Sequence, residues 1–86
     1  MTLILKPIPG DGVPVKAATL IDGAFTITAS VFQKPDNWRC TLTVEQAGDS
    51  PASVQLQSSN KDLATLLGSM ADFCSRKLGK PYTFLV

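Results

Sequence analysis

The side chains that are able to do chemistry in this chain are few, and histidine is absent. Histidine is the commonest general base and the commonest metal ligand, so its absence removes most acid–base, nucleophilic and metal arrangements. The two cysteines, Cys40 and Cys74, alternate with apolar residues. A reactive thiolate needs exposure and a positive neighbour, and a zinc site needs about four ligands. We therefore expect both cysteines to pack in the core, and a disulfide between them is not favoured.

The remaining polar motifs are those of turns. Gly10-Asp11-Gly12 lacks the Lys-Ser/Thr pair of a phosphate-binding loop, and the residues after it read as a strand rather than a helix N-terminus. Asp22, Asp36 and Asp49 also stand in turn-forming stretches, where a carboxylate bonds the local backbone. The sequence predicts no catalytic residue, no metal ligand and no cofactor, so we expect a protein that is not an enzyme. An active site completed by a partner or a second copy is the least favoured hypothesis.

Composition and charge indicate one small globular domain over residues 1–86. Apolar residues make up 44% of the chain and charged residues 17%, which argues against disorder. The net charge of +1 gives no bulk attraction to nucleic acid or acidic membranes, and little repulsion between copies. No apolar run approaches the roughly 20 residues that span a bilayer, and the first residues lack the pattern of a signal peptide. We expect a cytoplasmic protein without membrane contact.

One long helix is predicted near the end of the chain, over residues 59–79. Its apolar residues recur three to four positions apart, which places them on one stripe. Ser59 is the predicted N-cap, with Asp62 three residues later in an arrangement close to a capping box. Gly79 suits the left-handed conformation after a helix, and Pro81 prevents continuation.

The rest of the chain reads as antiparallel strands that this helix must cover. Alternating apolar and polar residues predict strands at residues 15–21, 24–32, 38–45 and 53–58. Asp22-Gly23 predicts a two-residue hairpin turn that sets Leu20 opposite Phe25 and Ala18 opposite Ile27. The predicted fold is an α+β domain, an antiparallel four- to five-stranded β-meander with one C-terminal α-helix packed on its apolar face, in the order ββββα. The apolar termini are expected to add short strands, which pair either within the fold or between two chains.

The predicted core combines the apolar face of the strands with the helix stripe. Trp38 is expected to fill the end of this core rather than to stand at an interface. The core residues are Ala18, Leu20, Phe25, Ile27, Ala29, Val31, Cys40, Leu42, Val44, Val54, Leu56, Leu63, Leu66, Leu67, Met70, Phe73, Cys74 and Leu78.

The opposite face of the predicted sheet is polar and carries few charges. Two interpretations are open: a solvated face built from β-favouring threonines, or a flat docking surface whose neutral side chains cost little to desolvate. Phe32 and Tyr82 are candidate aromatic anchors for it, with no assigned position. The candidate interaction surface consists of Thr26, Thr28, Ser30, Arg39, Thr41, Thr43, Gln55 and Gln57. A separate candidate anion contact consists of Arg76, Lys77 and Lys80 at the helix end, where complementing the helix dipole is the simpler explanation.

These features favour a small protein–protein interaction module without catalysis: an adaptor, inhibitor or assembly factor of the phage or bacterial accessory type, and a homodimer. The sequence does not identify the partner protein. The alternative is a single-stranded nucleic-acid-binding protein that uses the outer sheet face as a dimer. Four antiparallel strands followed by a helix resemble the layout of the single-stranded-DNA-binding coactivator fold. The eight basic residues are scattered without forming a stripe, which disfavours nucleic acid.

Overall fold

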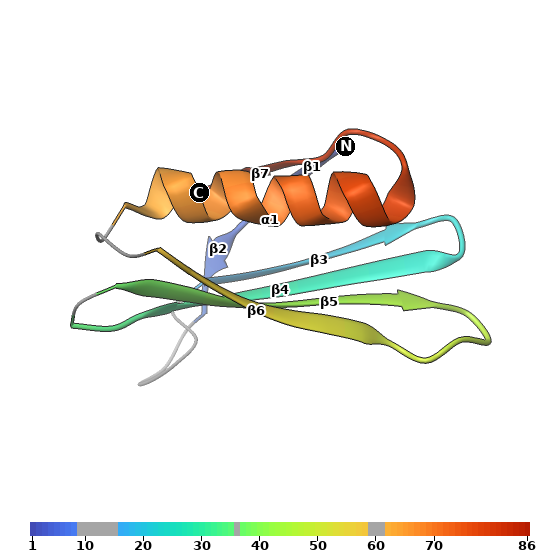
Figure 1. Cartoon of the computed structure of the whole chain (residues 1–86), viewed down its shortest axis with the longest axis horizontal. Helices are drawn as coiled ribbons and strands as arrows, with labels where there is room; N and C mark the ends of the chain where they lie inside the picture. Colours follow the sequence, from blue (N-terminus) through green and yellow to red (C-terminus); the bar gives the residue numbers. More distant parts are fainter. Residues whose placement is uncertain (9–15, 36, 59–61) are drawn as a thin grey trace.

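The computed structural model describes residues 1–8, 16–35, 37–58 and 62–86, with the side chains of Gln57 and Ser58 left out. An antiparallel five-stranded sheet is covered on one face by a helix and a two-stranded pair (Figure 1). The elements are β1 (Thr2–Ile4), β2 (Lys6–Pro7), β3 (Lys16–Asp22), β4 (Phe25–Gln33), β5 (Trp38–Gln46), β6 (Ala52–Ser58), α1 (Leu63–Leu78) and β7 (Thr83–Leu85). This arrangement confirms the predicted α+β class. The Gly10-Asp11-Gly12 loop, Asp36 and Ser59 lie outside the described residues.

The five-stranded sheet follows the predicted meander, in the order β2-β3-β4-β5-β6. The predicted hairpin register was wrong by two residues: Leu20 lies opposite Ile27, and Asp22 lies opposite Phe25. The turn consists of Gly23 and Ala24 rather than Asp22 and Gly23, because Gly23 takes a positive φ of 62° at the first central position. A shift of two residues keeps every side chain on its own face, so the predicted sorting of apolar and polar residues is retained.

The helix begins later than predicted, at Leu63. Its N-cap is Asp62 and not Ser59, because the Asp62 carboxylate accepts hydrogen bonds from the backbone N–H of Thr65 at 3.3 Å and from the Thr65 hydroxyl at 2.6 Å. The helix ends as predicted at Gly79, whose φ is 74° and whose N–H donates to the Ser75 carbonyl at 2.8 Å. Leu66, Met70 and Cys74 form the fully buried stripe of the helix.

The two chain termini form the rest of the covering layer. β1 and β7 pair in parallel with Leu3 opposite Phe84, and they lie beside α1 on the same side of the sheet (Figure 1). The termini therefore pair within the fold, which was one of the two arrangements expected from the sequence. Their inward side chains extend the core beyond the predicted set, whose members are all buried or packed against it. The additional buried residues are Leu3, Leu5, Tyr82 and Phe84.

Trp38 is half-buried and packs against this core, as predicted. No helix in the described part of the chain is long and apolar enough to cross a bilayer.

Candidate functional site

The sheet has one covered and one open face. Side chains that alternate with the buried ones along β3, β4, β5 and β6 point away from the helix layer. Of the elements that the structure describes, none lies over them (Figure 1). We call this surface the open face. It consists of Ala17, Thr19, Ile21, Thr26, Thr28, Ser30, Phe32, Arg39, Thr41, Thr43, Glu45, Ser53 and Gln55.

The structure brings the predicted interaction surface together on the open face. Thr28 lies opposite Thr43, and Thr41 lies opposite both Ser30 on one neighbouring strand and Gln55 on the other. Gln57 is opposite Arg39 in the strand register, although its side chain is not described. The middle of the face thus presents hydroxyl and amide groups over three adjacent strands.

These polar groups are partly organised among themselves. The Thr43 and Ser53 hydroxyls share a hydrogen bond of 2.7 Å across β5 and β6. Hydroxyls still offer further donor and acceptor positions, because each carries one hydrogen and two lone pairs. Such a face can form hydrogen bonds to a partner without stripping water from many charged groups.

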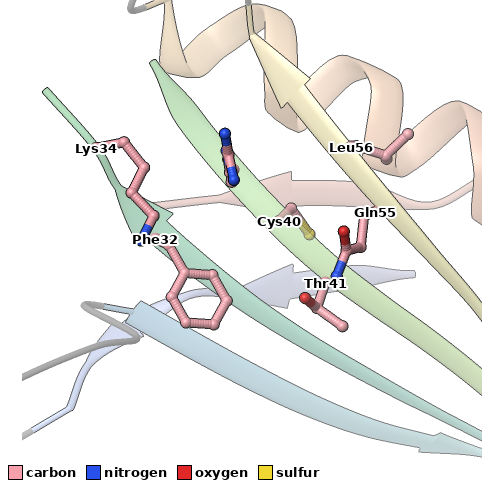
Figure 2. A pocket seen from close by; sticks show the side chains of 7 residues that line it. Phe32, Lys34, Cys40, Thr41, Gln55 and Leu56 are labelled. Carbon is pink, nitrogen blue, oxygen red and sulfur yellow. The ribbon is translucent and has the colours of Figure 1, made fainter. Parts of the chain in front are cut away.

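One end of the open face is hollowed. The hollow has a volume of about 480 Å³, and Figure 2 shows Phe32, Thr41 and Gln55 around it, with Lys34 at its rim. Arg39 also lines it and stands directly opposite Phe32 on the neighbouring strand. The hollow therefore combines an aromatic ring, two cations and two neutral hydrogen-bonding side chains. We call it the Phe32 hollow.

The two cations of the Phe32 hollow are exposed and have no acidic partner among the described residues. Glu45, the acidic residue of the open face, stands at the other end of β5 opposite Thr26. Lys34 and Arg39 give this end of the face a local positive potential, and no carboxylate of the described residues pairs with either of them. An anionic group is the complementary ligand.

The predicted anion contact at the helix end is arranged differently. Arg76 forms an exposed salt bridge with Asp72 at 3.2 Å, one turn earlier in the helix. Lys80 forms a salt bridge with Asp22 at 2.8 Å. Lys77 lies exposed in the last turn of the helix. Two of the three cations are already bound to carboxylates, so the structure does not gather them into one anion site.

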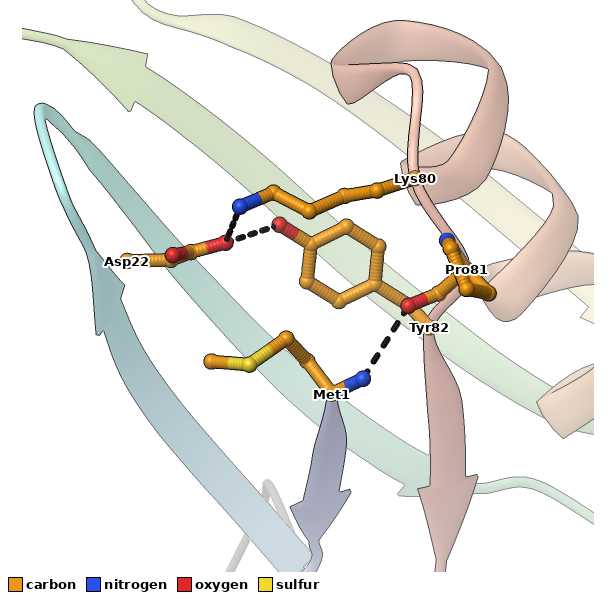
Figure 3. A network of polar contacts seen from close by, with 5 residues as sticks. All are labelled: Met1, Asp22, Lys80, Pro81 and Tyr82. Atoms are coloured by element: carbon orange, nitrogen blue, oxygen red, sulfur yellow. Dashed lines mark hydrogen bonds and ion pairs between the residues drawn. The ribbon is translucent and has the colours of Figure 1, made fainter.

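The Lys80 salt bridge belongs to a polar network that ties the hairpin of β3 and β4 to the segment after the helix (Figure 3). The Tyr82 hydroxyl donates to the same Asp22 oxygen, Oδ2, at 2.6 Å. The Lys80 ammonium and then the Tyr82 hydroxyl lower the pKa of Asp22. Burial, together with the Asp22 carboxylate, raises the pKa of Tyr82 to about 12. Tyr82 is thus a buried residue on the covered side, and its candidacy as an anchor of the outer face was wrong.

The cysteine side chains offer no reactive thiolate. Cys40 and Cys74 are free and buried, at 1% and 0% exposure. Burial raises the pKa of Cys40 to about 12 and that of Cys74 to about 11, so both remain protonated thiols near neutral pH. The prediction that they pack in the core is confirmed. Within the described residues, no three His, Cys, Asp or Glu side chains are grouped in a way that would hold a metal ion.

Sequence reasoning identified most of the open face but not the hollow. The signal for Phe32 was present, since it shares its parity along β4 with Thr28 and Ser30. Lys34 lies beyond the end of β4, so the alternation of side chains along the strand does not predict on which face it lies. A search of protein families, curated proteins and solved structures finds no match for the chain. The open face is therefore the feature of the molecule from which a function is inferred.

Proposed function

We propose that the protein is a small, non-enzymatic protein-binding module that acts as an adaptor, inhibitor or assembly factor and docks its partner on the open face. The observation that carries this proposal is the open face itself. It extends over the four strands β3 to β6 and offers neutral hydrogen-bonding groups around the Phe32 hollow.

The chemistry of the face suits protein docking energetically. Threonine, serine and glutamine lose less hydration energy on burial than lysine or glutamate, and interface centres are depleted in charged residues. Phe32 and Arg39 supply the aromatic and guanidinium groups that are enriched among binding hot spots. Charge complementarity defines the partner: it presents a carboxylate to Lys34 and Arg39 and an apolar group to the Phe32 ring.

The test is site-specific photocrosslinking in the cells that produce the protein. A photoreactive phenylalanine at Thr28, exposed in the middle of the open face, should give a discrete adduct. The same group at Ser69, exposed on α1, is the matched control and should give none. The adduct from position 28 should disappear when Arg39→Glu reverses the charge of the hollow. Equal adducts from both positions, or an adduct indifferent to Arg39→Glu, would refute docking on the open face.

Single-stranded nucleic acid is the second candidate, and a specific observation favours it. Phe32 lines the same hollow as Lys34 and Arg39, for which the described residues supply no acidic partner. An aromatic ring beside two cations is a combination that stacks a base and contacts phosphates. A labelled single-stranded oligonucleotide should then show fluorescence anisotropy that falls with added salt and is lost in Phe32→Ala. Absence of binding at low salt would eliminate this candidate and leave the protein partner.

A further inference from the structure

The two edges of the five-stranded sheet differ in how they are protected. At the β3 edge, Lys6 and Pro7 of β2 pair with the start of the strand, and the other end carries the Asp22–Lys80 salt bridge. Lysine, proline and charge near an exposed edge discourage pairing with another chain. The β3 edge is therefore protected at both of its ends.

The strand β6 itself, as far as the structure describes it, has none of these protections. β6 runs over seven residues, Ala52–Ser58, and contains neither a charged residue nor a proline. In the described part of the chain it pairs with β5 on one side only. Its outer backbone N–H and C=O groups form an unguarded template for a further strand.

We propose that β6 pairs antiparallel with β6 of a second copy of this chain, around a two-fold axis at Gln55. A two-fold interface requires a surface that is complementary to itself. β6 meets this requirement, because its alternation of polar and apolar residues is symmetric about Gln55. Val54 then lies opposite the second copy's Leu56 on the helix side, and Ser53 is paired in the register with residue 57 of the second copy. No like charges meet, since the strand has none.

The position of the helix fits this arrangement. α1 packs against both β5 and β6 and runs along them (Figure 1). With strands about 4.8 Å apart, a helix above the space between β5 and β6 lies about one strand spacing from the two-fold axis. The two copies of α1 would be about 10 Å apart, the distance at which helices pack against each other. Edge pairing thus leaves neither a wide gap nor a collision above the new strand pair.

This pairing extends the docking surface of the proposed function, and its biological role rests on that proposed function. In this register, side chains that lie directly opposite each other are on the same side of the sheet, so the open faces of both copies point the same way. Gln55, which lines the Phe32 hollow, would stand beside the second copy's Gln55. The two Thr41 side chains would be about 14 Å apart, three strand spacings. The docking surface becomes one continuous face with two hollows, which suits a partner that presents two anionic groups.

The experiment uses single cysteines in the full chain under mild oxidation. Gln55→Cys places two thiols directly opposite each other at the axis. Their Cβ atoms would be about 4.5–5.5 Å apart, close enough for a small shift of the strands to bring them to the separation of a disulfide, so the variant should cross-link into a dimer. Ser53→Cys is the matched control: two Ser53 positions are four residues apart along the paired strands, about 13 Å, and should not cross-link. Cys40 and Cys74 are buried and add no background.

A second measurement uses multi-angle light scattering on the unmodified protein, which should give twice the chain mass of 9.2 kDa. Gln55→Lys sets two ammonium groups against each other and should reduce the mass to that of one chain, whereas Thr28→Lys, away from the edge, should not. A monomeric wild type, or equal cross-linking of Gln55→Cys and Ser53→Cys, would refute edge pairing. If the protein is a monomer and position 28 still gives its cross-linked adduct, edge pairing is refuted and the proposed function is retained. If the protein is a dimer and that adduct is absent, the proposed function is refuted and edge pairing is retained.

Discussion

Replacing Phe84 with alanine should remove a large part of the stability of this domain. Phe84 lies in the short strand β7, is 3% exposed, and faces the sheet opposite Leu3 of β1. Its neighbour Leu85 is 49% exposed and faces solvent, so Leu85→Ala is a control one residue away on the same strand. The two substitutions affect adjacent positions of one strand, and they differ chiefly in the burial of the side chain that is removed.

The expected magnitude follows from the burial of the ring. Truncating a fully buried phenylalanine to alanine costs about 3–5 kcal/mol, through lost transfer free energy and the cavity that remains. A chain of 86 residues has a total unfolding free energy of about 4–13 kcal/mol at typical values per residue. Phe84→Ala should therefore remove about a quarter of the stability or more, whereas an exposed change such as Leu85→Ala should alter it by about 0.5 kcal/mol or less.

Urea denaturation, followed by Trp38 fluorescence and far-UV circular dichroism, measures both changes. With an m-value near the low end for small proteins, about 1 kcal/mol per molar, the midpoint of Phe84→Ala should fall by about 3–5 M. If that variant is unfolded in water, Phe84→Leu, which keeps most of the apolar volume, should show a smaller loss. Equal midpoints for Phe84→Ala and Leu85→Ala would show that β7 is not docked on the sheet and would refute the covering layer.

Three further predictions concern the glycines of the helix, the polar network and the thiols. Gly68→Ala should stabilise the helix by about 1 kcal/mol, because no atom lies within 4 Å of the added carbon, whereas Gly79→Ala should destabilise by about 1–2 kcal/mol at a φ of 74°. Because the folded state lowers the pKa of Asp22 below 3.8, its contribution to stability is present above that pH and is lost as the pH falls through the folded-state pKa. Asp22→Asn should therefore flatten the loss of thermal stability below pH 3.8, and an unchanged profile would contradict the network. Cys40 and Cys74 should react with a thiol reagent at neutral pH only in denaturant; rapid reaction of the native protein would contradict their burial.

The meander and the helix were predictable because their signals are local. Alternation places Ile27, Ala29 and Val31 on one face of β4 without any knowledge of the tertiary structure. The predicted hairpin register differs from the observed one by two residues, because Asp-Gly is the strongest sequence signal for a two-residue turn and was placed at the centre of the turn. The chain instead uses Gly23 as the first turn residue and retains Asp22 in the strand, where it binds Tyr82 and Lys80.

The covering layer was not predictable in the same way. Leu3 and Phe84 are far apart in the sequence. The apolar residues of a terminus indicate that it is buried, but they do not indicate which strand it pairs with. Tyr82 shows the same limit, since only the position of Asp22 in three dimensions decides that its hydroxyl is satisfied on the covered side. Phe32 differs from both: the sequence prediction left its position open, although strand parity along β4 is enough to place it on the open face.

The pairing of the two termini has a consequence for the order of folding. The hydrogen bond from the Met1 ammonium to the Pro81 carbonyl joins residues 80 apart in sequence, whereas the meander closes through short turns. Closing a loop of that length costs about 2 kcal/mol more in chain entropy than closing one of about ten residues. The meander is therefore the early-forming unit, and β1 and β7 dock last and separate first. Amide protons of β4 and β5 should exchange through global unfolding, while those of β1 and β7 should exchange through a lower-energy local opening that uncovers Leu3 and Phe84.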